Sequence, residues 1–478
     1  MTQLLGFLPD VDAATPGAIV DCTNVIPGPA GMVSAPSTVS VGGVPALVAE
    51  CRNAAIGTKL DGTRRIFAGT STNLYELSAG AWGSVSRAAL YSLGADDRWD
   101  FTQYGDATLA CTKTAVIQRS TAGAFADIAT APMAMAIEAA SGFVVAFNTN
   151  AGTDYWHCCA YLDETSWTVS LSTQATSGRL VSTPGAITAA KSFGDQIVAY
   201  KDRSMYLGRY VGTPSVWQWD LIPGDVGCIG VDAVTDLGGA GHLFVGRSDI
   251  SLFDGTRAQS IADGSVRQWF YDNLSQAYIY KTQVIHDKQN NLVWIFYPST
   301  ASSVCDQALV YHLTTKKWGR VTQTIQCALN YVSAGATIDG LGSFSSTIDG
   351  LPSVSLDSQY WLSGGRIMAV MSSANQLSTL TGISGASSMT LFEIGDDQVV
   401  TRLSRLRVGY QTAPTSASVA GSAKMSRGEA YAAGGSGEYA AGKFDLRQSG
   451  RFHQATVSAV GRWAAAVVDF DLSSAGQR

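Results

Sequence analysis

Two adjacent acids, Asp163 and Glu164, lie just before Trp167, and an acid pair beside a tryptophan could bind or cleave a sugar. Paired carboxylates work as acid and base when one of them is buried and its pKa is raised. Neighbouring side chains on a strand point to opposite faces, so these two could share a site only on an irregular backbone. A turn that carries solvated acids is the plainer interpretation.

His157, Cys158 and Cys159 are three consecutive residues of types that can bind a metal ion. Structural zinc usually needs two ligands separated by two to four residues, and needs that pattern twice. The three residues here are consecutive, and the remaining histidines lie far apart, at His242, His286, His312 and His453. We predict no metal site.

The sequence also lacks the motifs typical of nucleophilic catalysis and of phosphate or cofactor binding. The chain has no Gly-x-Ser-x-Gly, and the glycine-rich stretch 238–241 lacks the following helix and lysine of a phosphate-binding loop. No catalytic, cofactor-binding or metal-binding residue is therefore predicted, and the chain is not expected to be an enzyme.

The chain is long, rich in hydrophobic residues and poor in charged ones. It has 478 residues, 46% of them hydrophobic and 15% charged, with a net charge of −6, so it lacks the broad basic surface of a protein that grips DNA. No apolar run is long enough for a membrane span, and we expect no secretory signal. The eight scattered cysteines have apolar neighbours, which indicates buried thiols in a protein made in a reducing cytoplasm.

Self-similarity is the strongest structural signal. The stretch 73–86, with Tyr75 and Trp82, is repeated 236 residues later at 309–322, with Tyr311 and Trp318. Shorter matches are offset by 43, 89 and 177 residues, which are about one, two and four units of 44. The aromatic residues that close the units mark six repeats, at Trp82, Phe125, Trp167, Trp217 with Trp219, the degenerate stretch 253–261, and Trp318.

Each unit alternates apolar and polar residues between short turns, as antiparallel hairpins do. A unit of 40 to 50 residues is the length of one four-stranded propeller blade. We therefore predict an all-β protein: a six-bladed β-propeller in which equivalent aromatics fill equivalent gaps between blades, with an additional small β domain built from the chain termini. A β-solenoid would have a shorter period, and an array of β-sandwiches a longer one.

The repeat also sets the expected boundaries. Residues 1–45 are rich in Pro and Gly and are predicted to form an extended arm that joins a platform region. Residues 46–375 are assigned to the propeller, with a loop at the repeated Thr-Ile-Asp-Gly of 337 and 347 and a last strand near 358–371. Residues 376–478 are predicted to form a C-terminal β platform that lines a lumen.

Short motifs along nearly the whole chain resemble one family. They are the arm at 4–31, Lys201-Asp-Arg-Ser-Met-Tyr-Leu207 with Trp217 and Trp219, the stretch 224–230, Phe253-Asp-Gly255 with Ile261, and Gly450-Arg-Phe-His453 with Trp463. Together they look like the tail nozzle proteins of short-tailed bacteriophages, also called packaged-DNA stabilization proteins or tail tubular protein B. The chain is shorter than the largest relatives, which leaves little room for a long distal tip.

The resemblance implies a homo-hexamer in the virion tail, assembled in the host bacterial cytoplasm and attached below a ring of tail adaptor (head-to-tail connector) proteins. Its channel would retain the packaged genome and later conduct double-stranded DNA without reading its sequence, and tail fibre or spike proteins would attach outside. Low charge agrees with this role, since each cation in the wall would add a contact to phosphate and slow passage.

Two other functions stay open at this point. Exposed tryptophans such as Trp167 or Trp217 could stack on sugar rings in a carbohydrate- or receptor-binding propeller. A glycan hydrolase or lyase with its site at the propeller axis is the other alternative.

Overall fold

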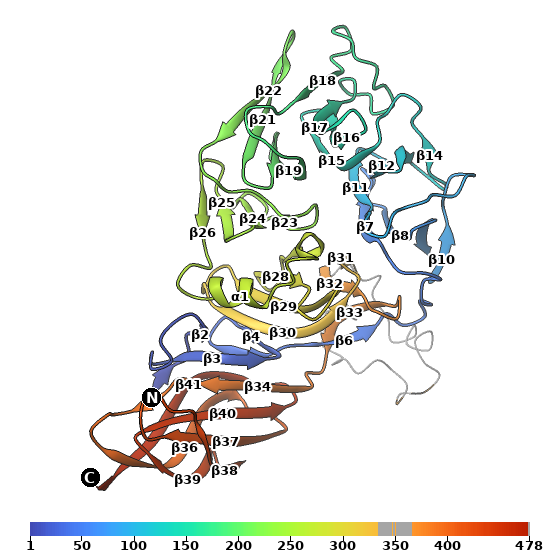
Figure 1. The fold of residues 1–478 in the computed structure, drawn as a ribbon. Coiled ribbons are helices and arrows are strands. Elements are labelled where there is room, and N and C mark those ends of the chain that lie inside the picture. Colours follow the sequence, from blue (N-terminus) through green and yellow to red (C-terminus); the bar gives the residue numbers. More distant parts are fainter. Residues whose placement is uncertain (333–346, 348, 350–365, 477–478) are drawn as a thin grey trace.

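Four-stranded antiparallel sheets repeat around a central axis in the computed structural model, which describes residues 1–332, 347, 349 and 366–476 (Figure 1). Six of them are separate sheets, so the predicted all-β fold with a six-bladed propeller is confirmed. Five of these sheets follow one another along the chain. The first has β7 (Asn53–Thr58), β8 (Arg64–Gly69), β9 (Leu74–Ser78) and β10 (Ala81–Ser84), and the second has β11 (Asp100–Tyr104), β12 (Ala107–Thr112), β13 (Ala115–Ser120) and β14 (Ala126–Asp127).

The third sheet has β15 (Ala134–Ala140), β16 (Phe143–Thr149), β17 (Gly152–Cys158) and β18 (Thr176–Arg179), the fourth has β19 (Ile187–Phe193), β20 (Gln196–Lys201), β21 (Met205–Gly212) and β22 (Val216–Ile222), and the fifth has β23 (Val234–Asp236), β24 (His242–Val245), β25 (Ile250–Phe253) and β26 (Ala258–Ser260).

The sixth sheet joins distant parts of the chain. Its strands are β31 (Cys327–Val332), β32 (Arg366–Met371), β33 (Leu377–Gly382) and β6 (Ser37–Ser40). Strand β6 comes from the predicted arm and pairs with β33, with Val39 opposite Thr379. Of the predicted strand near 358–371, residues 366–371 form β32, whereas 358–365 and most of the predicted loop at 333–350 lie outside the described residues.

A further four-stranded unit lies between two of these blades and belongs to the larger sheet formed with the chain termini. It consists of β27 (Gln283–Asp287), β28 (Leu292–Tyr297), β29 (Cys305–His312) and β30 (Trp318–Ile325). Its inner strand β27 contacts both β23 and β31, while β30 pairs with β4 (Val25–Pro27) of the terminal sheet. The predicted repeat that ends at Trp318 is this shared unit. The repeats did not reveal the sheet of β6 and β31–β33, because its strands are split between two ends of the chain.

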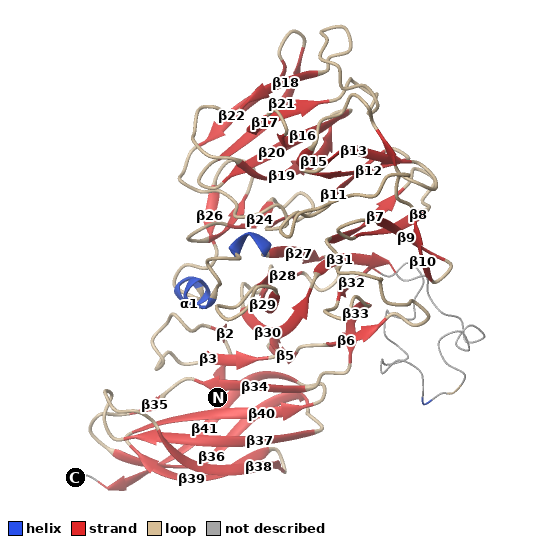
Figure 2. Cartoon of the chain, turned by 45° about the vertical axis from the view of Figure 1, so that its right-hand side comes forward, coloured by secondary structure: helices blue, strands red, loops and turns tan. Residues whose placement is uncertain are grey.

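The chain termini form a two-layered β sandwich below the ring (Figure 2). One layer has the order β3 (Ala18–Thr23), β34 (Ala386–Leu391), β40 (Phe452–Val460), β37 (Ser416–Lys424) and β38 (Ala432–Ala440). The other has β1 (Thr2–Gln3), β41 (Ala464–Gly476), β36 (Val400–Thr412) and β39 (Lys443–Gly450). The short strands β2 (Gly6–Phe7), β5 (Met32–Ser34) and β35 (Ile394–Gly395) pair at its margins.

One buried cluster runs from the ring into the sandwich. It includes Phe244 of β24, Trp318 of β30, Phe7 of the arm, and Leu403 and Val457 of the two sandwich layers. The helix α1 (Arg267–Asn273) and the 3-10 turn η1 (Ile279–Lys281) connect β26 to β27 beside this cluster. The arm is therefore buried between the propeller and the sandwich and packs against both.

The helices in the described part of the chain are short, and none of them is long and apolar enough to span a membrane.

The repeated phrase that revealed the fold occupies equivalent strands, but with different registers. Tyr311 pairs directly with Trp318 across a six-residue turn, whereas a tighter turn pairs Trp82 with Leu77 and leaves Tyr75 opposite Ser84. Trp318 is 1% exposed and packs against Tyr311 with ring centroids 4.6 Å apart, whereas Trp82 is only half-buried. The expected equivalence holds for the strands but not for the burial of the rings.

Candidate functional site

The acid pair that the sequence raised lies on a turn after β17, and each acid has a separate partner. The Asp163 carboxylate accepts hydrogen bonds from the Thr165 backbone N–H at 3.0 Å and its hydroxyl at 2.6 Å, which closes the turn and lowers the pKa of Asp163. Glu164 instead forms an ion pair with Arg119 of β13, with 2.7 Å between Nε and Oε1. The turn was predicted correctly, but Glu164 is held between blades rather than solvated.

The His157-Cys158-Cys159 run is built into its blade. The His157 imidazole nitrogen Nε2 lies 2.8 Å from the Trp167 carbonyl oxygen, and burial raises the pKa of both thiols to about 12. The described residues contain no group of three histidine, cysteine or acidic side chains placed to hold a metal ion. The glycine-rich stretch 238–241 is the turn between β23 and β24, where the Asp236 carboxylate accepts from the Gly238 N–H at 2.9 Å.

The tryptophans proposed as sugar platforms are buried. Trp167 is 1% exposed and donates its indole N–H to the Glu164 carbonyl at 2.9 Å, and Trp217 is 4% exposed. Neither ring face is open to a ligand. Both residues pack within the cluster of the blades formed by β11–β22.

Charged side chains that were not predicted as site residues gather on the inner strands of the ring and just before them. We call these five the axial cluster: Arg98, Asp100, Glu138, Lys191 and Asp232. The Lys191 ammonium on β19 lies 2.6 Å from Glu138 on β15, and Asp100 on β11 accepts from the Ile137 backbone N–H at 2.8 Å. Three neighbouring blades are thus joined at their inner edges.

A second ion pair of this cluster reaches across the ring. Arg98, just before β11, lies 2.5 Å from Asp232, just before β23, and the same carboxylate accepts from the Asn53 side chain at 3.1 Å. Arg98 and Asp232 precede the inner strands of two blades, and Asn53 is the first residue of the inner strand of a third. Their contacts therefore close the middle of the ring at the end where these strands begin.

Burial makes Asp100 the unusual acid of the axial cluster. It raises the pKa of Asp100 to about 7. Repulsion from Glu138 also raises this pKa, whereas attraction to Lys191 lowers it. The same two carboxylates raise the pKa of Lys191, although its burial alone would lower it. Asp100 therefore changes charge near neutral pH while Lys191 stays positive.

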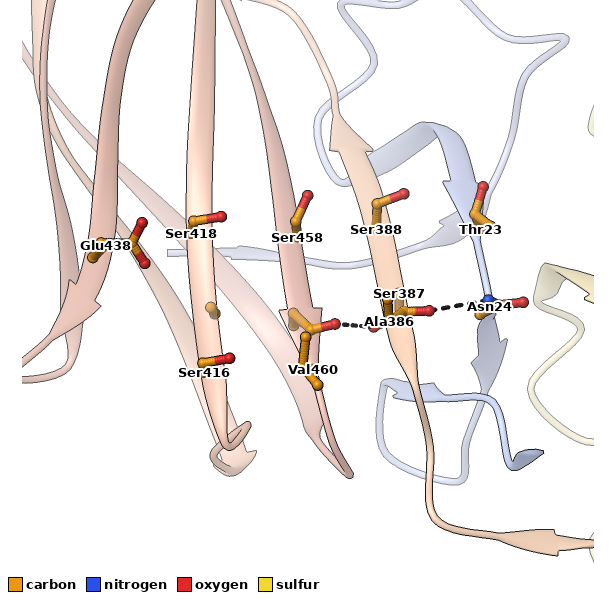
Figure 3. A pocket seen from close by; sticks show the side chains of 12 residues that line it. Thr23, Asn24, Ala386, Ser387, Ser388, Ser416, Ser418, Glu438, Ser458 and Val460 are labelled. Atoms are coloured by element: carbon orange, nitrogen blue, oxygen red, sulfur yellow. Dashed lines mark hydrogen bonds between the residues drawn. The ribbon is translucent and has the colours of Figure 1, made fainter. Parts of the chain in front are cut away.

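Small polar side chains line one face of the sandwich, which we call the hydroxyl face. Cross-strand pairing aligns one row over five strands: Thr23 of β3, Ser388 of β34, Ser458 of β40, Ser418 of β37 and Glu438 of β38. Figure 3 shows these side chains side by side along the row. A shallow hollow of about 360 Å³ covers this region.

The lining of this hollow is small, polar and free of cations. It consists of Thr23, Asn24, Ala386, Ser387, Ser388, Ser416, Ala417, Ser418, Glu438, Ser458, Ala459 and Val460, with a single charge, at Glu438. Alternation produces it, because Met389, Val419 and Val457 point into the core while their neighbours point outward. The alternating Ser and Thr of 386–390, 416–422 and 456–458 were the signal that sequence reasoning missed.

The opposite face of the sandwich has the reverse character. There Arg405 of β36 lies 3.2 Å from Asp445 of β39 and 3.6 Å from Asp471 of β41, and Arg407 lies 3.7 Å from Asp469. Several charges of this domain are thus sorted onto that side, whereas the hollow in the hydroxyl face has one charged lining residue, Glu438. Such sorting is not needed for folding, because exposed ion pairs add little stability.

Comparison with known proteins gives no family. No family model and no curated protein matches the chain. Similar solved structures include the computationally designed Ika8 protein (8% identity, 72% of this chain and 100% of the other, TM-score 0.40), YCF48 bound to D1 peptide (13%, 60% and 87%, 0.37) and the Neurospora crassa Pan2 WD40 domain (9%, 69% and 88%, 0.37). At TM-scores this low these likenesses carry no weight for function.

Proposed function

We propose that the chain is a structural subunit of a short phage tail, a hexameric nozzle below the adaptor ring that retains packaged DNA and conducts it during ejection. The observation that carries the proposal is the hydroxyl face, where a shallow hollow over five strands has no Lys or Arg in its lining. DNA sliding past such a wall meets hydroxyl groups and one carboxylate, so no counterion-releasing contact holds a phosphate in place. In this assembly the hydroxyl face lines the lumen.

The remaining surfaces suit the other contacts of a nozzle. The charged face formed by β36, β39 and β41 can pair with adjacent subunits or with the adaptor ring through its arginines and aspartates. The propeller lies on the far side of the arm from the sandwich and is available for tail fibre or spike proteins (Figure 1). The resemblance of the sequence motifs to tail nozzle proteins supports the same assignment.

Assembly is the first test. We expect the purified chain, alone or with its adaptor protein, to form a ring with about six times the chain mass of 50.2 kDa, as measured by light scattering and electron microscopy. Images should place the sandwich around the pore and the propellers outside. A chain that stays monomeric in both conditions would refute the proposal.

Cations introduced into the hydroxyl face provide the second test. Ser418→Lys with Ser458→Lys adds two positive charges to the row, and particles that carry this pair should eject DNA several-fold more slowly at low salt, with the delay reduced at high salt. Ser473→Lys on β41 is the matched control, because it lies opposite Arg402 in the other layer. Equal ejection rates for both variants would show that the hydroxyl face does not meet DNA.

An axial hydrolase is the second candidate, and the axial cluster is the observation that favours it. Asp100, with its pKa near neutrality, could act as an acid beside a second carboxyl group, that of Glu138. The ion pairs to Lys191 and Arg98 already occupy the neighbouring carboxylates, which favours a role in closing the ring. Glycan cleavage that is abolished by Asp100→Asn would establish the enzyme in place of the nozzle.

A further inference from the structure

Two thiols meet at the seam where the propeller ring closes. Cys51 lies in the segment that leads from β6 into β7, and Cys327 is the first residue of β31. Their sulfur atoms are 3.5 Å apart, 276 residues apart in sequence, and both side chains are at most 1% exposed. All eight cysteines are free.

Hydrogen bonds hold the two segments in this position. The Cys51 backbone N–H donates to the side chain of Gln326, the neighbour of Cys327, at 2.9 Å. The Gln326 amide donates in turn to Asn375 at 2.6 Å, and Asn375 donates to the Leu47 carbonyl at 3.4 Å. The two sulfur atoms are thus positioned by a network around them rather than by a mobile surface loop.

The two thiols differ in reactivity. Burial opposes ionisation of Cys51, but the hydrogen bond with Cys327 and the nearby Arg98 guanidinium lower its pKa overall. The same hydrogen bond, together with burial, raises the pKa of Cys327 well above its usual value. The lower pKa favours Cys51 as the thiol of the pair that ionises more readily.

We propose that Cys51 and Cys327 are a modification site that a small-molecule disulfide oxidises to a structural disulfide, closing the propeller ring covalently. The Cys51 thiolate attacks the reagent and releases one of its halves as a thiol. Cys327 then loses its proton and attacks the mixed disulfide at the Cys51 sulfur, releasing the second half. Two protein thiols and one disulfide become one protein disulfide and two small thiols, so atoms and electrons balance.

The Cys51–Cys327 disulfide would join the two segments at which the propeller ring closes. A disulfide bond is about 2.0 Å long, so bond formation brings the two sulfur atoms, now 3.5 Å apart, roughly 1.5 Å closer. The loop that the bond closes contains every strand from β7 to β30. Oxidation would therefore convert most of the ring into a covalent circle and limit the freedom of the unfolded chain.

Peptide mapping tests the proposal directly. The native chain is incubated with oxidised glutathione, and a second sample is refolded from urea in a glutathione redox buffer, so that burial does not restrict access. Free thiols are then blocked, and peptides are analysed without reduction. We expect a cross-linked peptide of Cys51 and Cys327 in most molecules and a melting temperature several degrees higher, both reversed by a reducing agent.

Variants separate this bond from others. Cys51→Ser and Cys327→Ser should each remove the cross-linked peptide and the thermal gain, whereas Cys22→Ser on β3 should keep both. Two results would overturn the proposal: free thiols at both positions after both treatments, or a Cys51–Cys327 bond that lowers the melting temperature. Pairing of Cys51 with another cysteine in the wild-type chain would overturn it as well.

Discussion

Residue burial distinguishes the two halves of the repeated aromatic phrase. Trp318 is 1% exposed within the cluster that joins ring and sandwich, whereas Trp82 is half-buried at the edge of another. Trp318→Ala should therefore lower the free energy of unfolding by about 3–5 kcal/mol, and Trp82→Ala by about 1–2 kcal/mol. Urea unfolding of the two variants measures the difference. Equal losses would mean that the two rings fill equivalent gaps after all.

Asp100 should make stability depend on pH. In the folded chain its pKa is about 7, whereas an unfolded aspartate titrates near pH 4. Between these values the native state binds more protons than the unfolded state, so the stability that this residue contributes at low pH is lost as the pH rises from about 4 to 7. Above pH 7 the charged carboxylate remains as a buried cost.

Replacing Asp100 with Asn removes this titration and keeps an oxygen to accept the Ile137 N–H. Compared with wild type, Asp100→Asn should gain on the order of 2–4 kcal/mol in relative stability between pH 4.5 and pH 8, as measured by urea unfolding at several pH values. The exposed Asp195→Asn, in the turn between β19 and β20, is the matched control. Parallel curves for wild type and Asp100→Asn would contradict the assignment.

At the scale of elements, β8 packs so closely on the next blade that only glycine is accommodated at one position. A Cβ at Gly69 would lie 2.1 Å from the Trp99 ring, which is itself fully buried and donates to the Thr70 carbonyl at 2.9 Å. Gly69→Ala should therefore displace Trp99 and cost about 1–3 kcal/mol in thermal or urea unfolding. Gly83→Ala is the control, since its Cβ would come no closer than 4.0 Å to the Glu76 carbonyl oxygen. A neutral Gly69→Ala would show that the two blades can separate at this contact.

Local pattern explains which elements were predictable. Hairpins within a blade pair neighbours in sequence, so alternation and turn residues around stretches such as 104–117 were enough to predict them. The pairing of β6 with β33 joins Val39 to Thr379, and no local pattern encodes a contact over 340 residues. The axial cluster was missed for a similar reason, since Asp100, Glu138 and Lys191 come together only when three inner strands converge.

The hydroxyl face was within reach of the sequence but was not identified. Its Ser and Thr alternate with core residues in β34, β37 and β40, which is the ordinary pattern of a half-buried strand. What the pattern could not show is the register that aligns Ser388, Ser458 and Ser418 in one row. Register depends on partners that are distant in the sequence.

For the whole molecule, the arm connects the propeller to the sandwich through strand pairing and a shared buried cluster. Within the arm, β1 pairs with β41, β3 with β34 and β4 with β30, so both bodies share its backbone hydrogen bonds. Asp10 also accepts from the Gln268 and Trp269 N–H groups at 2.7 and 2.9 Å, at the start of α1. Because the buried cluster is continuous across these contacts, neither body can lose the arm without exposing apolar surface.

Phe7 tests this coupling. Its ring is fully buried, 4.9 Å from that of Trp269, between the ring and the sandwich. We expect the wild-type chain to unfold in one calorimetric transition, and Phe7→Ala to move that transition to lower temperature as it loses about 3–5 kcal/mol. Leu5→Ala on the same arm, where the side chain is 40% exposed, should cost at most about 1 kcal/mol. Two separate transitions in the wild-type chain would contradict a shared core, because each body would then be stable without the other.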